Sequence, residues 1–462
     1  MSRLIIVSNR VQPPADNAPA NQGGLAVALA SALRAHDGVW CGWSGETTDH
    51  FTGEIATQTS AGVTTATIDL EAQDVEEYYN GFANRTLWPL LHHRTDLAEH
   101  ERGFAGGYER VNHRFADTFA PLIGADDLVW VHDYHLFPLG RDLRQRGVRN
   151  RIGFFLHTPW PPTQLLLSLP SHRTLVESLF DYDLIGFQTE EWLDNFEHYL
   201  STELGLEPGP DGEYRSGDRS FRVLACPIGI DGEEFAELSR SPAARYSRYR
   251  MKQSATGRDL IVGVDRLDYS KGLEERFLGY ERFLAGNPEQ HSEVFLLQIA
   301  PPSRGEVESY QTIRSTLDAL SGRINGNFAD IDWVPIRYVN QGYPRAKLAG
   351  IYRAAKIGLV TPLRDGMNLV AKEYVAAQDP EDPGVLILSR FAGAAAQLKD
   401  AVLVNPYSPD DIADGISQAL TMRRGERTAR WESMMHNVVT ENVSWWLARF
   451  TKALEARSKV TA

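Results

Sequence analysis

Cysteine and positive charge are both scarce in this chain of 462 residues. Cys41 and Cys226 are its only cysteines, and their spacing fits neither a zinc site nor a redox pair. So little cysteine predicts a reducing compartment. The formal net charge of −14 argues against a nucleic-acid partner, because such a partner requires a basic face. Local basic clusters would still bind phosphate inside an acidic protein.

Long apolar runs are missing as well. The run Leu4–Val7 is followed at once by polar Ser8-Asn9-Arg10, so it is too short for a signal peptide or a membrane span. We therefore expect a cytoplasmic protein with no membrane partner. A homo-oligomer is also expected, although no residue pattern sets the number of subunits.

Three familiar catalytic patterns are missing too. The sequence has no recognisable Ser-His-Asp triad, no Walker loop and no Gly-x-Gly-x-x-Gly fingerprint. The composition is that of a globular protein, with 42% apolar and 23% charged residues. A chain of this length is too long for one ordinary core and predicts two or three domains.

Short apolar runs alternate with helical patterns along most of the chain, which predicts parallel sheets covered on both faces. We expect an α/β fold of two doubly wound Rossmann-like domains that face each other across a cleft. The predicted domains are 1–230 and 231–440, with a terminal helix at about 441–462 packing back onto the first. The predicted strands are Leu4–Val7, Leu128–His132, Ile152–Leu156, Leu184–Phe187, Leu260–Val264, Val294–Ala300, Ile357–Thr361, Val385–Leu388 and Ala401–Val404.

The most informative segment is Leu359–Gln378, which has the pattern of a strand, a tight turn and a helix. Asp365 and Gly366 break the strand, and helical spacing places Lys372 and Glu373 on a polar side. A helix N-terminus attracts phosphate, and a carboxylate further along would accept hydrogen bonds from a ribose. The segment therefore predicts a nucleotide site, although an ordinary strand-turn-helix has the same pattern.

A second cationic turn follows the strand that ends at Val264. Arg266 and Lys271 lie five positions apart before a helix, which suggests a diphosphate site. An ion-pair network with Asp265 and Asp268 is the alternative. Arg304 adds a further cation just past the next predicted strand.

Histidines and an aspartate end two strands of the first half. His132, Asp133 and His135 leave two interpretations open, which are a metal site and sugar recognition by Asp133. His157 ends the next strand, either as a buried core histidine or as a ligand-binding one. At the amino end, Arg10 would grip a phosphate or carboxylate.

These segments together closely resemble the trehalose-6-phosphate synthases, a family of retaining glycosyltransferases with the GT-B fold. The resemblance spans nearly the whole chain in order, so chance similarity is a poor explanation. It is carried by Ser8-Asn-Arg10, Gly23-Gly24-Leu25, Trp40-Cys-Gly-Trp-Ser-Gly45, Tyr78-Tyr79-Asn80, Leu87-Trp88-Pro89, Trp130-Val-His-Asp-Tyr-His135, Gly153-Phe-Phe-Leu-His157, Asp181-Tyr-Asp-Leu-Ile-Gly-Phe-Gln-Thr189, Asp265-Arg-Leu-Asp-Tyr-Ser-Lys-Gly272 and the segment from Leu359.

The resemblance implies glucose transfer from a nucleotide-glucose, usually UDP-glucose, to glucose 6-phosphate, with no cofactor and no metal. It implies that Asp133 contacts the acceptor sugar near the reacting centre and that His157 contacts the donor glucose. The implied acceptor set is Arg10, Tyr79, Trp88, Asp133 and Arg304. The implied donor set is Gly24, Arg266, Lys271, Asp365, Gly366, Met367, Asn368, Leu369, Val370 and Glu373.

One local departure is the loop after His157, Thr-Pro-Trp-Pro-Pro162, where relatives vary between aromatic and small residues. It removes no expected ligand, but it leaves the nucleotide base and the details of the acceptor open. Two other activities remain as alternatives. These are transfer to another acceptor such as glycerol phosphate, and isomerisation of a nucleotide-sugar without any acceptor.

Overall fold

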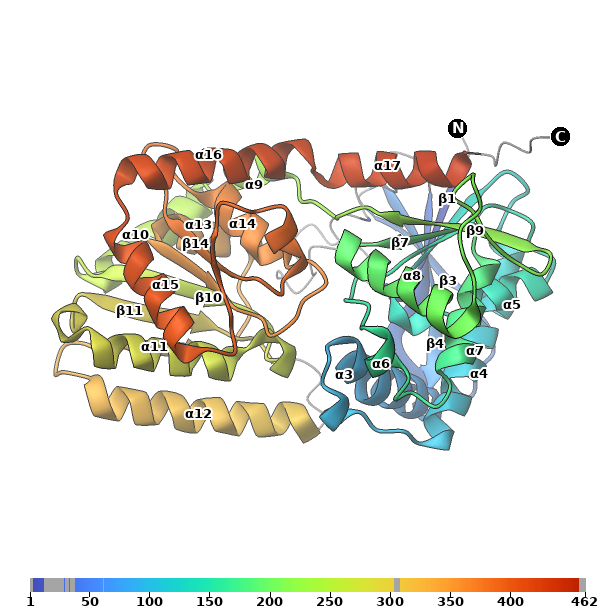
Figure 1. The fold of residues 1–462 in the computed structure, drawn as a ribbon, viewed down its shortest axis with the longest axis horizontal. Helices are drawn as coiled ribbons and strands as arrows, with labels where there is room; N and C mark the ends of the chain where they lie inside the picture. The colour runs from blue at the N-terminus through green and yellow to red at the C-terminus, as the bar shows by residue number, and fades with distance from the viewer. Residues whose placement is uncertain are drawn as a thin grey trace. The chain divides into compact units, whose positions relative to one another are not determined.

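The computed structural model describes residues 3–11, 29, 33, 38–60, 62–302 and 308–456. The chain divides into two compact units, each treated separately below. Unit 1 holds the described residues up to Pro227 together with those from Trp446 onward, and unit 2 is Ile228–Trp445 (Figure 1). The chain therefore passes from unit 1 to unit 2 and back again.

Unit 1 is built on a sheet whose strands follow the order β3-β4-β2-β1-β5-β6-β7-β9-β8. Neighbouring strands are parallel, except that β3 and β8 each run antiparallel to the strand beside them. The predicted strands β1, β5, β6 and β7 are confirmed. The bounds are β1 (Leu4–Arg10), β2 (Val39–Thr48), β3 (Ala56–Ser60), β4 (Val63–Glu71), β5 (Leu128–His132), β6 (Ile152–Phe155), β7 (Leu184–Phe187), β8 (Tyr214–Ser216) and β9 (Arg219–Ala225).

Helices connect these strands, and one of them is unusual because it is a π-helix of 13 residues, η1 (Val75–Leu87). The others in the described part of unit 1 are α2 (Ala72–Asp74), α3 (Trp88–Leu91), η2 (Thr95–Leu97), α4 (Arg102–Phe119), η3 (Ala120–Leu122), η4 (Tyr134–Leu136), α5 (Leu139–Gln145), α6 (Thr163–Leu166), α7 (His172–Glu177), η5 (Ser178–Asp181) and α8 (Glu190–Leu204).

The last helix, α17 (Val443–Glu455), contributes its apolar face to the core of unit 1. The ring of Phe450 stacks on Trp130 of β5, with centroids 4.4 Å apart. Trp446 packs against the same indole at 4.7 Å. These bulky side chains are fully buried, so the helix covers one face of the sheet.

Unit 2 contains an entirely parallel sheet in the order β12-β11-β10-β13-β14-β15. Five of its strands were predicted, and β12 was not. The bounds are β10 (Asp259–Val264), β11 (Val294–Ile299), β12 (Ile336–Val339), β13 (Ile357–Val360), β14 (Val385–Ser389) and β15 (Val402–Val404).

Helices cover both faces of this sheet, as expected for a doubly wound fold (Figure 1). They are α9 (Gly232–Leu238), α10 (Pro242–Ala255), η6 (Tyr269–Lys271), α11 (Leu273–Gly286), η7 (Pro288–Gln290), α12 (Glu308–Phe328), α13 (Arg345–Ala354), α14 (Leu369–Ala377), η8 (Gly393–Ala396), α15 (Pro409–Thr421) and α16 (Arg424–Thr440). The predicted α/β class with two Rossmann-like units is confirmed. Across the described residues, no helix has the length and apolar character needed to cross a bilayer.

Candidate functional site

The loop between β13 and α14 has the predicted strand-turn-helix form and is held in place by its neighbours. The Asp365 amide donates to the Phe391 carbonyl at 3.2 Å, and the amide of Ala394 donates to the Met367 carbonyl at 2.7 Å. Gly393 lies so close that a Cβ atom would stand 2.0 Å from the Gly366 carbonyl oxygen. These contacts fix the backbone conformation of the loop, and the close approach requires glycine at position 393.

Asn368 ends this loop and begins α14. Its backbone is left-handed, with φ of 76°, and its side-chain oxygen accepts a hydrogen bond from the Ala371 amide at 3.1 Å. Asparagine tolerates this conformation better than most residues and is a favoured N-cap. Leu369 and Val370 are half-buried in the first turn. The free amides of that turn are aimed at the carboxyl end of the sheet, where ligands of such folds bind.

Lys271 and Asp365 connect the cationic turn after β10 with the loop between β13 and α14, the two segments that the sequence predicted as parts of a nucleotide site. The Lys271 ammonium lies 2.6 Å from Asp365 Oδ2, which also accepts from the Asn368 amide nitrogen at 3.1 Å. The side chains of Lys271 and Asp365 are only 11% and 14% exposed. The ion-pair partner of Lys271 thus comes from the β13–α14 loop, and not from Asp265 or Asp268, which the alternative interpretation had suggested.

Asp265 and Asp268 have structural partners. Asp265 pairs with the fully buried guanidinium of Arg276 at 2.7 Å, and burial raises its pKa against the opposing charges of Arg276 and Lys271. Asp268 caps η6 by accepting from the Ser270 amide at 2.9 Å. Arg276 also donates to Thr361 Oγ1 at 3.0 Å. One buried cation thus ties the ends of β10 and β13 together.

The turn that carries Lys271 is fitted against the end of β13. Gly272 has φ of 61°, and a Cβ atom there would stand 2.3 Å from the Thr361 carbonyl oxygen. The Leu363 amide donates to the Ser270 carbonyl at 2.8 Å. The two loops are thus packed directly on each other. Arg266 follows β10 on the same connection and has an exposed side chain.

Helix α14 corrects one expectation. Lys372 was placed on a polar side, but it is fully buried and donates to the Ile228 carbonyl and to Gln397 Oε1, each at 2.7 Å. Burial lowers its pKa to about 7. Glu373 is half-buried beside it, and burial raises its pKa to about 7, with Arg345 opposing the shift and Glu234 adding to it.

In unit 1, Asp133 occupies a strained position just past β5. Its φ of 75° and ψ of 166° are rare for a residue with a side chain and cost about 1–3 kcal/mol. The Asp133 amide donates to the Phe155 carbonyl at 2.8 Å, and its Oδ1 accepts from the His157 amide at 3.3 Å. The strained turn therefore holds this carboxylate at the carboxyl ends of β5 and β6.

His157 is part of a hydrogen-bonded row of side chains. The Gln188 amide nitrogen donates to His157 Nδ1 at 3.0 Å, and His157 Nε2 lies 3.0 Å from His132 Nδ1. Because Nδ1 accepts, the proton of the neutral ring is on Nε2 and is donated to His132. Burial lowers the pKa of His157 to about 3 and that of His132 well below its usual value. Both rings are therefore neutral at physiological pH.

Three of the expected acceptor residues of unit 1 are Arg10 at the end of β1, Tyr79 within η1 and Trp88 at the start of α3. The Arg10 guanidinium lies 5.6 Å from the centre of the Trp43 ring, and Tyr79 packs edge-on against the same ring at 5.6 Å. Tyr79 also stacks on His135 at 6.0 Å. Trp88 is 6% exposed and packs on Tyr134, whose loop also carries Asp133. Arg10, Tyr79 and Asp133 are thus linked through aromatic neighbours.

Gly24 and Arg304 lie outside the described residues. Three contributors were missed by the sequence reasoning, namely Arg276, Gln188 and Gly393. Arg276 has the spacing of an ordinary helix surface residue, and Gly393 belongs to a segment with no visible motif. Gln188 lies within the 181–189 block that carries the resemblance, but no role was expected for it. Within the described ranges, no group of three or more His, Cys, Asp or Glu side chains is arranged to hold a metal ion.

Two doubly wound units, each with charged side chains near the carboxyl ends of its strands, have the architecture of the GT-B fold. The sequence pattern of glycosyltransferase family 20 matches residues 2–456. The chain belongs to glycosyltransferase family 20.

Characterised relatives match over nearly their whole length. A trehalose-6-phosphate synthase from Sinorhizobium fredii is 48% identical over 460 residues, covering 99% of each chain. The crystal structure of an alpha,alpha-trehalose-phosphate synthase (UDP-forming) from Burkholderia xenovorans in complex with glucose-6-phosphate has a TM-score of 0.95 at 48% identity, covering 98% of this chain and 100% of that one. The E. coli structure bound with UDP-2-fluoro glucose has a TM-score of 0.94 at 45% identity, covering 99% of both.

Proposed function

We propose that the chain is a trehalose-6-phosphate synthase that transfers glucose from UDP-glucose to glucose 6-phosphate with retention of configuration. The observation that carries this proposal is the 2.6 Å contact between Lys271 and Asp365, which brings together the two segments expected to bind the donor. The full-length similarity to synthases with glucose-6-phosphate or a UDP-glucose analogue bound supports the same conclusion.

In unit 2, Arg266 and Lys271 bind the donor diphosphate, together with the backbone amides of Gly366, Met367, Asn368, Leu369 and Val370. Asp365 binds the transferred glucose, and Glu373 accepts hydrogen bonds from the ribose. The fixed backbone path of the Asp365–Asn368 loop supports this assignment, because preorganised amides stabilise charge without reorganising. Gly24 completes the donor set by sequence resemblance.

In unit 1, Arg10, Tyr79 and Trp88 bind the acceptor phosphate and sugar, with Arg304 added by resemblance. Asp133 contacts the acceptor sugar near the reacting centre, and its strained backbone supports a functional role. His157 was expected to contact the donor glucose. A positioning role is proposed for its ring instead, since both ring nitrogens are already hydrogen-bonded within the protein.

The chemistry follows from where charge develops. As the bond from the anomeric carbon to the diphosphate breaks, negative charge grows on the leaving oxygens and is stabilised by Arg266, Lys271 and the N-terminus of α14. The anomeric hydroxyl oxygen of glucose 6-phosphate bonds to the anomeric carbon on the face that the diphosphate leaves, and a leaving phosphate oxygen takes its proton. Because attack and departure share one face, the configuration is retained. Each preorganised donor supplies roughly 3 kcal/mol, and enzymes require about 8–23 kcal/mol, so several donors and the positioning of both sugars act together.

We also propose that no metal is required, because two cations and a helix end neutralise the diphosphate. Full activity in EDTA is the expected result. A strict metal requirement would instead revive His132 and His135 as ligands. A cytoplasmic location and homo-oligomerisation likewise remain predictions.

The deciding experiment is product analysis. The purified enzyme is supplied with UDP-, GDP- or ADP-glucose together with glucose 6-phosphate or glycerol phosphate, and the products are separated and identified. Trehalose 6-phosphate with an α,α linkage is expected, with UDP-glucose the preferred donor. Activity with glycerol phosphate alone, or conversion of the donor without any acceptor, would refute the proposed function.

A further inference from the structure

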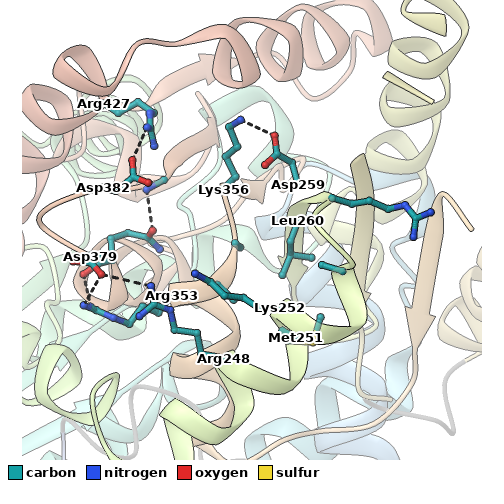
Figure 2. Close-up of a pocket in the computed structure, with 17 residues that line it drawn as sticks. Arg248, Met251, Lys252, Asp259, Leu260, Arg353, Lys356, Asp379, Asp382 and Arg427 are labelled. Carbon is teal, nitrogen blue, oxygen red and sulfur yellow. Dashed lines mark hydrogen bonds and ion pairs between the residues drawn. The ribbon is translucent and has the colours of Figure 1, made fainter. Parts of the chain in front are cut away.

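Unit 2 contains a concave site at the end of its sheet opposite the donor loops. It is a cavity of about 460 Å³ beside the amino ends of the central strands (Figure 2). Asp259 and Leu260 begin β10, Lys356 directly precedes β13, and Gly384 precedes β14. Ligands of the proposed reaction bind at the carboxyl ends, so this cavity is separate from the site described above.

The cavity is basic although the protein as a whole is acidic. Six cationic side chains line it, from Arg248, Lys252, Arg258, Arg353, Lys356 and Arg427. Only three carboxylates, those of Asp259, Asp379 and Asp382, accompany them. The lining therefore carries three more positive than negative charges, in a chain whose net charge is −14. A concave surface of one sign focuses its field and concentrates counter-ions.

Three of the cations are already paired with carboxylates. Lys356 pairs with Asp259 at 2.6 Å, Arg427 with Asp382 at 2.6 Å, and Arg258 with Asp332, outside the lining, at 2.7 Å.

The unused bonding capacity is at Arg248 and Lys252. Asp379 is shared between Arg353 at 3.2 Å and Arg248 at 3.5 Å. Arg248 Nε is buried and has no hydrogen-bond partner among the described residues. Lys252 is exposed, and no carboxylate in the described ranges pairs with it. Such donors match the oxygens of a phosphate group.

Like charges are also crowded at this place. Burial lowers the pKa of the Arg353 guanidinium, Asp379 opposes that effect, and the neighbouring Arg248 and Arg240 lower the pKa further. An anion in the cavity would relieve this repulsion. The apolar side chains of Met251 and Leu260 complete the lining, which gives the non-ionic part of a small ligand a surface to contact.

One residue of the cavity lining, Arg353, is hydrogen-bonded to α14, the helix whose N-terminus belongs to the proposed donor site. Arg353 Nη1 donates to the carbonyls of Ala377 and Gln378, at 3.1 and 2.7 Å, and so caps the C-terminus of that helix. A ligand at Arg353 would therefore touch the end of α14 that is remote from the proposed reaction.

We propose that this cavity binds a phosphorylated small molecule, with its phosphate group held between Arg248 and Lys252 beside Arg353. The site lies outside the donor and acceptor sites, and its occupation is measured as binding rather than as turnover. Its failure is therefore distinguishable from a failure of the proposed function.

The test is to measure the dissociation constants of three probes for the full chain by isothermal titration calorimetry. The probes are inorganic phosphate, ribose 5-phosphate and adenosine 5′-monophosphate. These separate the phosphate alone from a sugar phosphate and from a nucleotide. The double variant R248M/K252M should bind at least one probe at least about tenfold more weakly than the wild type, because it loses charge-assisted hydrogen bonds. Arg248→Lys, which keeps the charge but loses Nε, should give an intermediate loss.

The matched control is Arg250→Met, which removes one cation from the exposed side of the same helix without lining the cavity. It should bind every probe as the wild type does, and thermal unfolding should show all variants folded. Lys252→Met alone provides a variant that loses no ion pair with the described residues. If no probe binds, or if each binds R248M/K252M as tightly as the wild type, the proposed site does not exist.

Discussion

The Nζ atom of Lys271 lies 2.6 Å from Oδ2 of Asp365, although 94 positions separate the two residues in the chain. In this structure Asp365 holds the ammonium at the carboxyl end of the sheet, next to the amides that begin α14. A donor diphosphate would therefore meet a cation that is already oriented. Lys271 would therefore act from a fixed position, and not only as a positive charge in the vicinity.

Substitution of Lys271 by Met, or of Arg266 by Ala, should lower kcat by about a hundredfold, as expected when a transition-state donor is lost. The measurement is kcat and KM for UDP-glucose at saturating glucose 6-phosphate. Lys347→Met, which removes an exposed cation on α13, serves as the control. An unchanged kcat in either active-site variant would remove that residue from the diphosphate role.

Substitution of Arg276 by Met should destabilise the protein by about 3–5 kcal/mol, because it leaves the Asp265 carboxylate buried without its main partner. The free energy of unfolding in urea provides the measurement. The double variant R276M/D265L should recover part of the loss, since it removes both charges together. A loss below about 1 kcal/mol would mean that water or another group solvates Asp265.

The KM for UDP-glucose should depend on pH through Glu373, whose pKa burial raises to about 7. The carboxylate is the form that accepts ribose hydrogen bonds, and it is lost as pH falls. KM should therefore rise about tenfold between about pH 8 and about pH 6.

Glu373→Gln should make that KM profile flat, because its amide does not titrate. Lys372 titrates in the same range, so Lys372→Met is the control and should keep the dependence if the variant folds. A profile that stays steep in Glu373→Gln would assign the pH dependence to a different group.

Substitution of Gly272 by Ala should destabilise unit 2 by more than about 1 kcal/mol and lower activity with it. The residue has φ of 61°, and a Cβ atom would press on the Thr361 carbonyl. Gly286→Ala, at the other end of α11 with nothing near its Cβ, should leave stability unchanged or raised. Equal melting temperatures for the two variants would contradict the close fit of the two loops.

The buried strands were predictable from the sequence because a parallel strand covered on both faces is an unbroken apolar run. The strand β2 escaped prediction because Gly and Ser interrupt its apolar run, β4 because Thr does, and β3 because it is mostly exposed and polar. The polar stretch at 239–258 contains helix α10. No apolar periodicity predicted this helix, because its buried face uses small residues such as Ala244 and Ser247.

Local patterns also located Lys271 and Asp365, but they did not reveal that the two side chains meet. The same limit explains Lys372, whose acceptors at Ile228 and Gln397 are supplied by segments far away in the chain. Helical spacing therefore does not predict whether a charged side chain is exposed when acceptors from distant segments can satisfy its hydrogen bonds while it is buried. The roles assigned to individual site residues remain predictions until the variants are measured.

The loop from Asp365 to Asn368 is hydrogen-bonded to the 391–394 segment of the protein's own backbone. The loop therefore loses its conformational entropy when the protein folds, and not when a substrate binds. Substrate binding in unit 2 then requires little ordering of this loop, so more of the contact free energy is left to appear as affinity or rate. A donor analogue should consequently change the amide hydrogen-exchange rates of this loop much less than binding to a disordered loop would.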